Sequence, residues 1–394
     1  MKLARRLDHI EPFYVMECAK AAQDIARSAA CDPARGGRPM IYLNIGEPDF
    51  TAPPAVQAAA KACLAAGLTQ YTAATGLPAL REKLSHWYLQ RFGLQIAPER
   101  IVITAGASAA LQLVCLALFE RGDQVLMPDP CYPCNRHFVA AADAQAVLLN
   151  CGAEQRYQLS ASQVESAWNK HTRGVLLASP SNPTGTSIAP EEMLRIVELV
   201  RARGGVSIVD EIYLGLSYDE RYGQSALRLG DDIISVNSFS KYFGMTGWRL
   251  GWLVLPPALV APVEKLAQNL FICASSIAQY AALACFEPVV IAEYERRRAE
   301  FRARRDFLVP ALQSLDLKVP VAPDGAFFVW ADCSAHSPSS WDFTFELMRS
   351  AHVAVTPGRD FARLEADRFV RFSFANSLEH LQESVQRIGH ALQR

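Results

Sequence analysis

A lysine between aromatic side chains is the residue in this sequence whose surroundings most directly suggest chemistry. Lys241 lies in the string Ser-Phe-Ser-Lys-Tyr-Phe, residues 238–243, directly after a run of apolar residues. Burying a charged amine there is costly, so desolvation would lower its pKa and produce a neutral nucleophile. The alternative is a lysine whose amine reaches solvent while its methylenes stay buried. The segment alone leaves both interpretations open.

Two other polar side chains follow apolar runs that are typical of sheet strands. Asp210 ends the run 206–210, and Asn182 lies in the turn Ser-Pro-Ser-Asn-Pro-Thr-Gly, residues 179–185. In α/β folds the carboxyl ends of strands carry ligand-binding groups, and a buried carboxylate there needs a cationic or protonated partner. Each residue also has a structural explanation, because aspartate often caps the following segment and asparagine is common in turns.

An arginine in an apolar strand suggests a site for an anion. Arg371 lies in Phe-Val-Arg-Phe-Ser-Phe-Ala, and its planar guanidinium suits a carboxylate bound through two hydrogen bonds. An internal salt bridge is the alternative. A second anion site is suggested by Gly106-Ala107-Ser108 at the start of an expected helix, where backbone N–H groups suit a phosphate. Arg249 would supply the countercharge.

A buried amine, an aspartate, a phosphate cradle and a carboxylate-binding arginine together describe one recognisable task. The sequence resembles the class I/II aminotransferases, which are pyridoxal-phosphate (PLP) enzymes of fold type I. The resemblance runs from Asn-Ile-Gly-Glu-Pro-Asp-Phe, residues 44–50, to the string around Arg371. It implies an α/β fold with a large domain, built on a mainly parallel mixed sheet flanked by helices, and a smaller α/β domain.

The motifs that carry the resemblance imply how the cofactor is held. Ser-x-Ser-Lys matches the family's Schiff-base lysine at Lys241, and Asp-x-x-Tyr places Asp210 and Tyr213 at the pyridine nitrogen and the ring hydroxyl. These three are the expected catalytic residues. Asn-Pro-x-Gly places Asn182 at the same hydroxyl and at the substrate carboxylate. The other implied cofactor residues are Ala107, Ser108, Ser238 and Arg249 at the phosphate, Tyr132 on the ring face, and Tyr71, which reaches the phosphate of a neighbouring subunit.

The resemblance implies an enzyme that moves an amino group from an L-amino acid to a 2-oxo acid, with 2-oxoglutarate as the expected acceptor, by a ping-pong mechanism. Gly46 and Arg371 would hold the substrate α-carboxylate, and the shared site implies a homodimer. Another PLP reaction on the same scaffold, such as β-elimination, a carbon–sulfur lyase or a synthase, stays open. A PLP-responsive regulator is disfavoured, because the sequence has neither a helix-turn-helix pattern nor a basic excess.

The identity of the substrate is less well determined by the motifs. Some dicarboxylate-specific relatives use a further arginine from the partner subunit, and the stretch 266–280 contains no confident match to it. Phe271, Ile272 and Tyr280 in this stretch leave room for apolar or aromatic substrates. They are explained equally well as side chains of a helix core.

The elements that must position these residues alternate between short apolar runs and amphipathic stretches. This alternation predicts a mainly parallel sheet covered on both faces. Helices are expected at 108–119 and 190–203, among others. The predicted strands are 101–104, 124–127, 146–149, 175–178, 206–210, 233–237 and 250–255.

The pattern changes after Pro256. A long helical region is expected at 258–313, with one break at Glu287-Pro288, and the arginines between residues 296 and 305 are interpreted as a solvated face paired with glutamates. Strands at 327–330, 353–356 and 369–374, followed by a helix at 378–392, predict a second unit. The expected domains are an N-terminal segment, 1–45, that packs on the small domain, a large PLP-binding domain, 46–290, and a small C-terminal domain, 291–394.

Composition favours small-molecule chemistry. The 394 residues include 39 Lys and Arg against 40 Asp and Glu, so a general nucleic-acid binder is not expected. The charged residues Asp8 and Glu11 interrupt the apolar run that a secretory signal would need. The apolar stretch 109–119 is too short to cross a bilayer. Together these features predict a cytoplasmic protein without membrane association. Cys131 and Cys134 form a C-x-x-C pattern without the second pair that zinc needs, so no metal is expected, and a redox role stays open.

Overall fold

The computed structural model describes residues 2–12 and 14–393, and a seven-stranded sheet forms its centre. Its strands are β2 Ile101–Thr104, β3 Gln124–Asp129, β4 Gln145–Asn150, β5 Thr172–Ala178, β6 Val206–Asp210, β7 Ile234–Ser238 and β8 Gly251–Val254. Their order across the sheet is β2-β8-β7-β6-β5-β3-β4. β8 is antiparallel to both of its neighbours, and all other pairings are parallel. The mainly parallel mixed sheet expected from the sequence is therefore confirmed.

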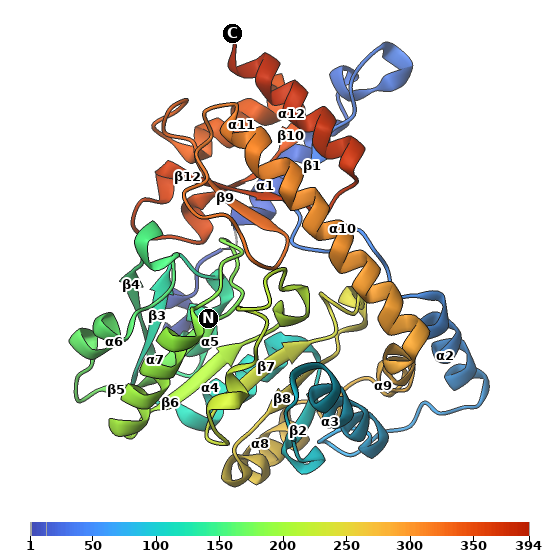
Figure 1. Ribbon diagram of the computed structural model, residues 1–394, viewed down its shortest axis with the longest axis vertical. Helices are drawn as coiled ribbons and strands as arrows, with labels where there is room; N and C mark the ends of the chain where they lie inside the picture. The colour runs from blue at the N-terminus through green and yellow to red at the C-terminus, as the bar shows by residue number, and fades with distance from the viewer. Residues whose placement is uncertain (1, 13, 394) are drawn as a thin grey trace.

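Helices cover both faces of this sheet, which explains why its strands are continuous apolar runs (Figure 1). Successive residues of β2 point to opposite faces: Val102 belongs to the same buried cluster as the inner side of α4 (Gly106–Leu118), whereas Ile103 belongs to the cluster that includes α3 (Pro78–Phe92). The other helices of this unit are α2 Pro54–Ala65, α5 Pro133–Ala141, α6 Ala161–Ala167, α7 Pro190–Ala202, α8 Pro257–Leu270 and α9 Ser276–Ala282.

The C-terminal residues form a smaller unit that lies beyond one end of the large sheet, and α10 (Pro288–Gln313) runs between the two (Figure 1). The N-terminal segment packs on this unit, because β1 (Ile41–Tyr42) pairs in parallel with β10 (Val353–Ala354), and buried residues of α1 (Tyr14–Ala26) share a cluster with Met348. The unit's antiparallel sheet has the order β11-β12-β9, with β11 Thr356–Pro357, β12 Phe369–Ser373 and β9 Phe328–Asp332, next to α11 Ser340–Ser350 and α12 Leu378–Leu392.

Two expected elements are divided differently from the sequence-based prediction. The helical region has a further break between α8 and α9 (Ser276–Ala282), where Ile272 has a φ of 63° that no right-handed helix accepts. The strand expected at 353–356 is two strands, because the chain leaves its pairing with β1 at Ala354 and joins β12 at Thr356. Apolar periodicity marks both segments as buried, but it does not specify which neighbour each half pairs with.

Five of the six arginines of α10 pair with carboxylates of the chain, but the face is not solvated throughout, as the sequence interpretation had it, because Arg304 is buried. Arg296 pairs with Glu293 and Glu300, and Arg304, which is buried, pairs with Glu300 and with Asp49 in the N-terminal part of the chain. No helix among the described residues is long and apolar enough to cross a membrane. Within residues 2–12 and 14–393, no group of three or more His, Cys, Asp or Glu side chains is arranged to hold a metal ion.

Candidate active site

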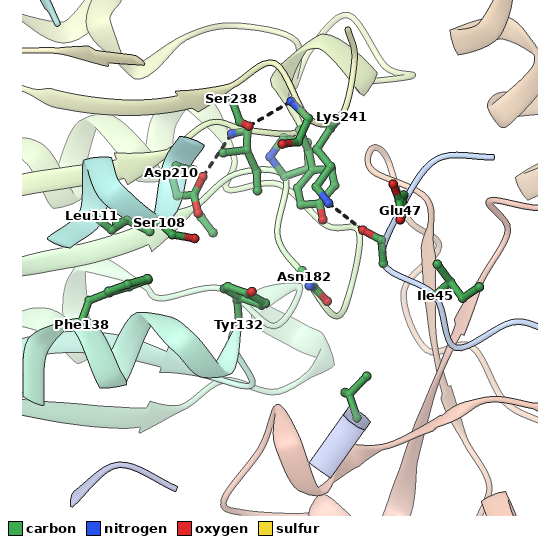
Figure 2. A pocket seen from close by; sticks show the side chains of 18 of the residues that line it. Ile45, Glu47, Ser108, Leu111, Tyr132, Phe138, Asn182, Asp210, Ser238 and Lys241 are labelled. Carbon is green, nitrogen blue, oxygen red and sulfur yellow. Dashed lines mark hydrogen bonds between the residues drawn. The ribbon is translucent and has the colours of Figure 1, made fainter. Parts of the chain in front are cut away.

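A cavity of about 360 Å³ lies between the carboxyl edge of the large sheet, which contributes Asp210 and Ser238, and the smaller unit, which contributes Arg371. This is the edge where parallel α/β sheets bind ligands. All of the site residues expected from the sequence line it, with the exception of Tyr71 (Figure 2). They are Gly46, Ala107, Ser108, Tyr132, Asn182, Asp210, Tyr213, Ser238, Lys241, Arg249 and Arg371.

Lys241 directs its amine into this cavity, and its aromatic neighbours hold the backbone. Phe239 and Phe243 are fully buried in the core. The Lys241 Nζ donates a hydrogen bond of 2.6 Å to the Gly46 carbonyl and lies 5.7 Å from the ring centre of Tyr213. Burial lowers the pKa of this amine from its ordinary 10.5 to about 8, and a nearby carboxylate, that of Glu47, partly opposes the shift. The amine is therefore directed into the cavity and not toward bulk solvent.

Asp210 ends β6 as a buried carboxylate. Its Oδ1 accepts a hydrogen bond of 3.1 Å from the Ile212 backbone N–H, so the local turn expected as its structural alternative is also present. Among the described residues it has no ion-pair partner within 4 Å, and burial raises its pKa to about 7. Burial likewise raises the pKa of the Tyr213 hydroxyl. An unpaired carboxylate that faces a cavity is suited to hold a proton on a basic ligand nitrogen.

Arg371 is a buried cation whose partners are neutral. Its Nη1 donates to Asn182 Oδ1 at 2.8 Å and its Nη2 donates to the Asn44 carbonyl at 2.9 Å. Its Nε is buried without a hydrogen-bond partner among the described residues, and none of their carboxylates lies within salt-bridge distance. Burial lowers its pKa to about 10. The internal salt bridge considered from the sequence is therefore absent there, and a ligand carboxylate would supply the missing charge.

The opposite end of the cavity can bind an anion such as a phosphate. The helix α4 begins at Gly106, so the first backbone N–H groups of a thirteen-residue helix face the cavity next to Ser108. Gly106 has a φ of 83°, and a Cβ on it would lie 2.6 Å from Arg249 Nη2, so this position requires glycine. Arg249 has no carboxylate partner among the residues that the structure describes. The Ser238 hydroxyl, which also lines the cavity, donates to the Leu250 carbonyl at 3.4 Å and accepts from the Ser240 N–H at 3.0 Å.

The structure also shows cavity residues that the sequence analysis did not find. Ile45 and Glu47 flank the expected site residue Gly46, and Leu111 lies one helical turn after the expected site residue Ser108. These positions in the sequence could have predicted that the three residues line the cavity. Val15 comes from the first turn of α1 and carries no comparable signal. The other additional lining residues are Phe138, Ala178, Pro180, Ile212 and Ser240.

Several expected residues lie outside the cavity of this chain. Tyr71 is 79% exposed and does not line it. Phe271, Ile272 and Tyr280, which left room for apolar substrates in the sequence analysis, do not line it either. Cys131 and Cys134 are free thiols, and burial raises the pKa of each, which disfavours the reactive thiolate form.

Comparison with known proteins identifies the family to which this cavity belongs. A family model described as aminotransferase class I and II matches residues 38–388. The chain belongs to this family. This aminotransferase is 37% identical over 381 residues to the valine–pyruvate aminotransferase of Mycobacterium tuberculosis, with 96% of each chain covered. It is 32% identical over 359 residues to an aspartate aminotransferase of Pyrococcus horikoshii, with 90% of this chain and 91% of that protein covered.

The three-dimensional comparison agrees with the family. The crystal structure of an aminotransferase from Mycobacterium tuberculosis matches this chain with a TM-score of 0.94 at 37% identity, covering 100% of this chain and 99% of the other. The fold is therefore that of the fold type I transaminases, and the family is PLP-dependent. The enzyme is an aminotransferase, and the lyase alternative considered from the sequence is not favoured.

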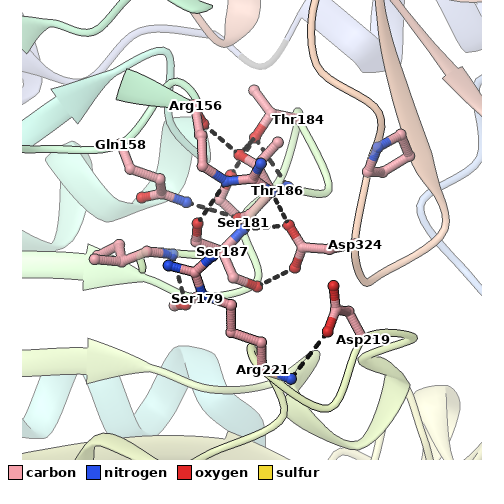
Figure 3. A network of polar contacts seen from close by, with 12 residues as sticks. Arg156, Gln158, Ser179, Ser181, Thr184, Thr186, Ser187, Asp219, Arg221 and Asp324 are labelled. Atoms are coloured by element: carbon pink, nitrogen blue, oxygen red, sulfur yellow. Dashed lines mark hydrogen bonds and ion pairs between the residues drawn. The ribbon is translucent and has the colours of Figure 1, made fainter. Parts of the chain in front are cut away.

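A polar network holds the loop that carries Asn182 in this aminotransferase (Figure 3). Asp324, which is buried, accepts hydrogen bonds from the Ser187 N–H at 3.0 Å, from the Ser187 hydroxyl and from Arg156. The backbone N–H groups of Asp324 and the next residue both donate to the Gly185 carbonyl at 3.0 Å. Gly185 has a φ of 67°, and a Cβ there would lie 2.5 Å from Pro323. The network therefore fixes the Asn182 loop against the segment that precedes β9.

We expect Asp324→Asn to raise KM for the amino acid about tenfold while PLP stays bound. The substitution removes one charge-assisted acceptor, about 1.5–3 kcal/mol, and loosens the loop that places Asn182 against Arg371. Steady-state kinetics and the PLP-to-protein ratio measure the two effects. The control is Asp306→Asn, an exposed carboxylate on α10. A fall in melting temperature and PLP content with KM unchanged would show a purely structural role.

Proposed function

We propose that this aminotransferase transfers the amino group of an L-amino acid to a 2-oxo acid by a ping-pong mechanism, with PLP attached to Lys241. The observation that carries the proposal is the convergence of Lys241, Asp210 and Arg371 on one cavity, where none of the three has an ion-pair partner among the described residues. The test incubates purified enzyme with a panel of amino acids and an acceptor, and measures 2-oxo acid formation. Release of pyruvate and ammonia without any acceptor would favour a lyase instead.

The residues of the cavity fit PLP in both charge and chemistry. When bound, PLP supplies an electron-accepting ring that makes the Cα–H bond of an amino acid labile. Asp210 would hold a proton at the ring nitrogen, and Tyr213 and Asn182 would contact the ring hydroxyl. Tyr132 contributes an aromatic side chain to the cavity wall. The phosphate would be bound by Ala107, Ser108, Ser238 and Arg249.

Binding and proton transfer at the substrate are proposed for a second set of groups. Arg371 would bind the α-carboxylate together with Asn182 and the backbone at Gly46, because its guanidinium is already held by neutral acceptors. Fixing the carboxylate orients the Cα–H bond relative to the Lys241 amine. This amine would take the proton at Nζ and return it, acting as general base and then general acid.

Covalent capture of PLP by the cofactor-free enzyme is expected to accelerate as pH rises, with a midpoint near 8. The neutral amine is the nucleophile, and burial holds the pKa of Lys241 at about 8, so its neutral fraction grows through this pH. Borohydride trapping followed by mass spectrometry measures the rate. Glu47→Gln is expected to move the midpoint down, because the Glu47 charge favours the protonated amine. A midpoint near 10.5, equal to that of a free lysine side chain, would contradict the burial argument.

We also propose a homodimer in which Tyr71 serves the neighbouring site. Tyr71 is exposed, yet both of its chain neighbours are held: the Gln70 carbonyl accepts from the Ser276 hydroxyl at 2.6 Å, and the Thr72 hydroxyl accepts from the Gln279 side-chain amide at 3.0 Å. Mixing two impaired variants, Tyr71→Ala and Lys241→Ala, is expected to restore part of the activity through mixed dimers that have one intact site. No restoration, with mixed dimers shown by native mass spectrometry, would contradict a shared site.

The division of the chain into domains is part of the same proposal. We propose a large PLP-binding domain at 46–290, a small domain at 291–394 and an N-terminal segment at 1–45. The pairing of β1 with β10 and the packing of α1 beside Met348 support the place of the N-terminal segment.

A further inference from the structure

A second buried carboxylate comes directly after Asp210 and has no role in the function proposed so far. Glu211 is 2% exposed, and no lysine, arginine or histidine nitrogen of the described residues lies within 4 Å of its oxygens. Arg221 and Arg228 line the same small cavity, but the first pairs with a glutamate of α7 and the second donates to a backbone carbonyl at the end of α3. A buried carboxylate without a cation is costly, so its retention here needs a physical reason.

Three hydrogen-bond donors converge on the Glu211 carboxylate. Its Oε1 accepts from the Ala226 backbone N–H at 2.7 Å, and its Oε2 accepts from the Ser225 hydroxyl at 2.9 Å and the Ser235 hydroxyl at 2.6 Å. The three donors come from two separate segments of the chain, the turn at 225–226 and the strand β7. The fold therefore surrounds this carboxylate with donors but not with a positive charge.

The direction of these hydrogen bonds indicates that Glu211 is ionised. The Ser225 hydroxyl accepts from the Leu227 N–H at 3.2 Å, and the Ser235 hydroxyl accepts from the Asn237 side-chain amide at 2.8 Å. Each hydroxyl therefore has its own proton left to donate to the carboxylate, and a backbone N–H can only donate. Burial raises the pKa of Glu211, and these three donors oppose the rise because they stabilise the charged form.

The far end of this network is anchored in the core, which keeps the Glu211 charge in place. Asn237 also donates to the Tyr88 hydroxyl at 3.1 Å, and Trp252 Nε1 donates to the same oxygen at 3.1 Å. These three side chains come from β7, α3 and β8, and all of them are buried. Bulk water and salt screen a charge in such surroundings only weakly, so it acts on its neighbours at nearly full strength.

Asp210 is the neighbour on which this charge acts. The Glu211 N–H donates to the Val236 carbonyl at 2.8 Å, so the pairing with β7 continues past Asp210 and successive side chains point to opposite sides. Asp210 lines the cavity, whereas Glu211 does not. Burial raises the pKa of Asp210 to about 7, and the negative charge of Glu211 adds to the rise. Two adjacent carboxylates repel each other, and a cation beside Asp210 would relieve this repulsion.

We propose that Glu211 is a positioning residue whose buried charge strengthens the hold of Asp210 on a protonated ring nitrogen of PLP. The inference rests on the proposed function, in which PLP is attached to Lys241 with its ring nitrogen beside Asp210. Glu211 touches neither cofactor nor substrate in this arrangement and acts through Asp210. A charge near the ring nitrogen tunes the electron-accepting power of the ring, so Glu211 supports the loss of the Cα proton.

The test compares PLP with deazapyridoxal phosphate, which has a C–H group in place of the ring nitrogen and cannot carry its proton. Equilibrium titration of the cofactor-free enzyme gives a dissociation constant for each compound, and the ratio of the analogue to PLP reports the nitrogen alone. Glu211→Gln is expected to lower this ratio at least about tenfold, since one pKa unit of interaction with a charged neighbour is a factor of ten. Glu211→Asp keeps the charge and is expected to keep the ratio.

The matched control is Asp324→Asn, which also removes a buried carboxylate but acts on the loop of Asn182, so it should affect both compounds alike. The double variant Glu211→Met with Ser235→Ala removes the charge together with its nearest donor and is a second route to the same ratio, because apolar replacement of buried polar groups is often tolerated. The ratio is taken within one preparation, so it is independent of the fraction of folded enzyme.

An unchanged ratio in the variants that lack the charge would overturn the inference, as would an equal fall in Glu211→Asp. The proposed function fails in a different way. If the unmodified enzyme binds neither compound, the attachment of PLP to Lys241 is wrong, and if it binds both equally well, Asp210 does not serve the ring nitrogen.

Discussion

Replacing Lys241 with alanine is expected to lower turnover by at least about four orders of magnitude and to abolish covalent attachment of PLP. The reason is positional as well as chemical. No other lysine lines the cavity in the described chain, and the Lys241 amine is already placed by its hydrogen bond to the Gly46 carbonyl. Multiple-turnover assays measure the first effect. Borohydride reduction followed by peptide mass spectrometry measures the second, and should find PLP on Lys241 of the unmodified enzyme alone.

Lys265→Ala is the matched control, because this lysine is exposed on α8 and lies outside the cavity. It should retain both activity and the PLP label. Full activity of the Lys241→Ala variant, or a label on a different lysine of the unmodified enzyme, would remove Lys241 from the mechanism. The two measurements are independent, so a preparation that folds poorly cannot be mistaken for one that has lost its nucleophile.

Replacing Arg371 with lysine is expected to lower kcat/KM for amino acids by about 100- to 1,000-fold while leaving PLP attached. A lysine keeps the positive charge, but it loses the planar fork that reaches both Asn182 and Asn44 and presents two parallel donors to a carboxylate. Disrupting one partner of a buried charge pair typically costs about 2–5 kcal/mol, or roughly 30- to 5,000-fold, and the expected loss lies in the middle of this range. Steady-state kinetics over a wide range of amino acid concentration separates KM from kcat.

The control for Arg371 is Arg368→Lys. Arg368 is half-exposed, comes just before the same strand, and pairs with Asp332 and Glu365. It should have little effect on KM. An Arg371→Lys enzyme with unchanged KM and kcat would show that the α-carboxylate binds elsewhere. Loss of PLP from this variant would show that Arg371 supports the fold of the cavity rather than the substrate.

The sequence by itself determined the architecture and most of the cavity. Runs such as 206–210 are apolar over their whole length because both faces of the sheet are covered, so they identify buried strands without any knowledge of their neighbours. The polar residue that ends such a strand, Asp210, stands out for the same reason. The aromatic neighbours of Lys241, which anchor its backbone in the core, made it a candidate, and the resemblance to the aminotransferases supplied its expected role.

Only the tertiary structure decided which groups meet. Arg371 was expected to need a carboxylate, but its contact with Asn182 depends on how a loop of the large sheet docks against β12. Val15 and Asp324 carry no local signal, because each acts through a contact with a segment distant in the chain. Apolar periodicity specifies that a segment is buried and which side faces inward. It does not specify the partner surface, which is set by the packing of whole units.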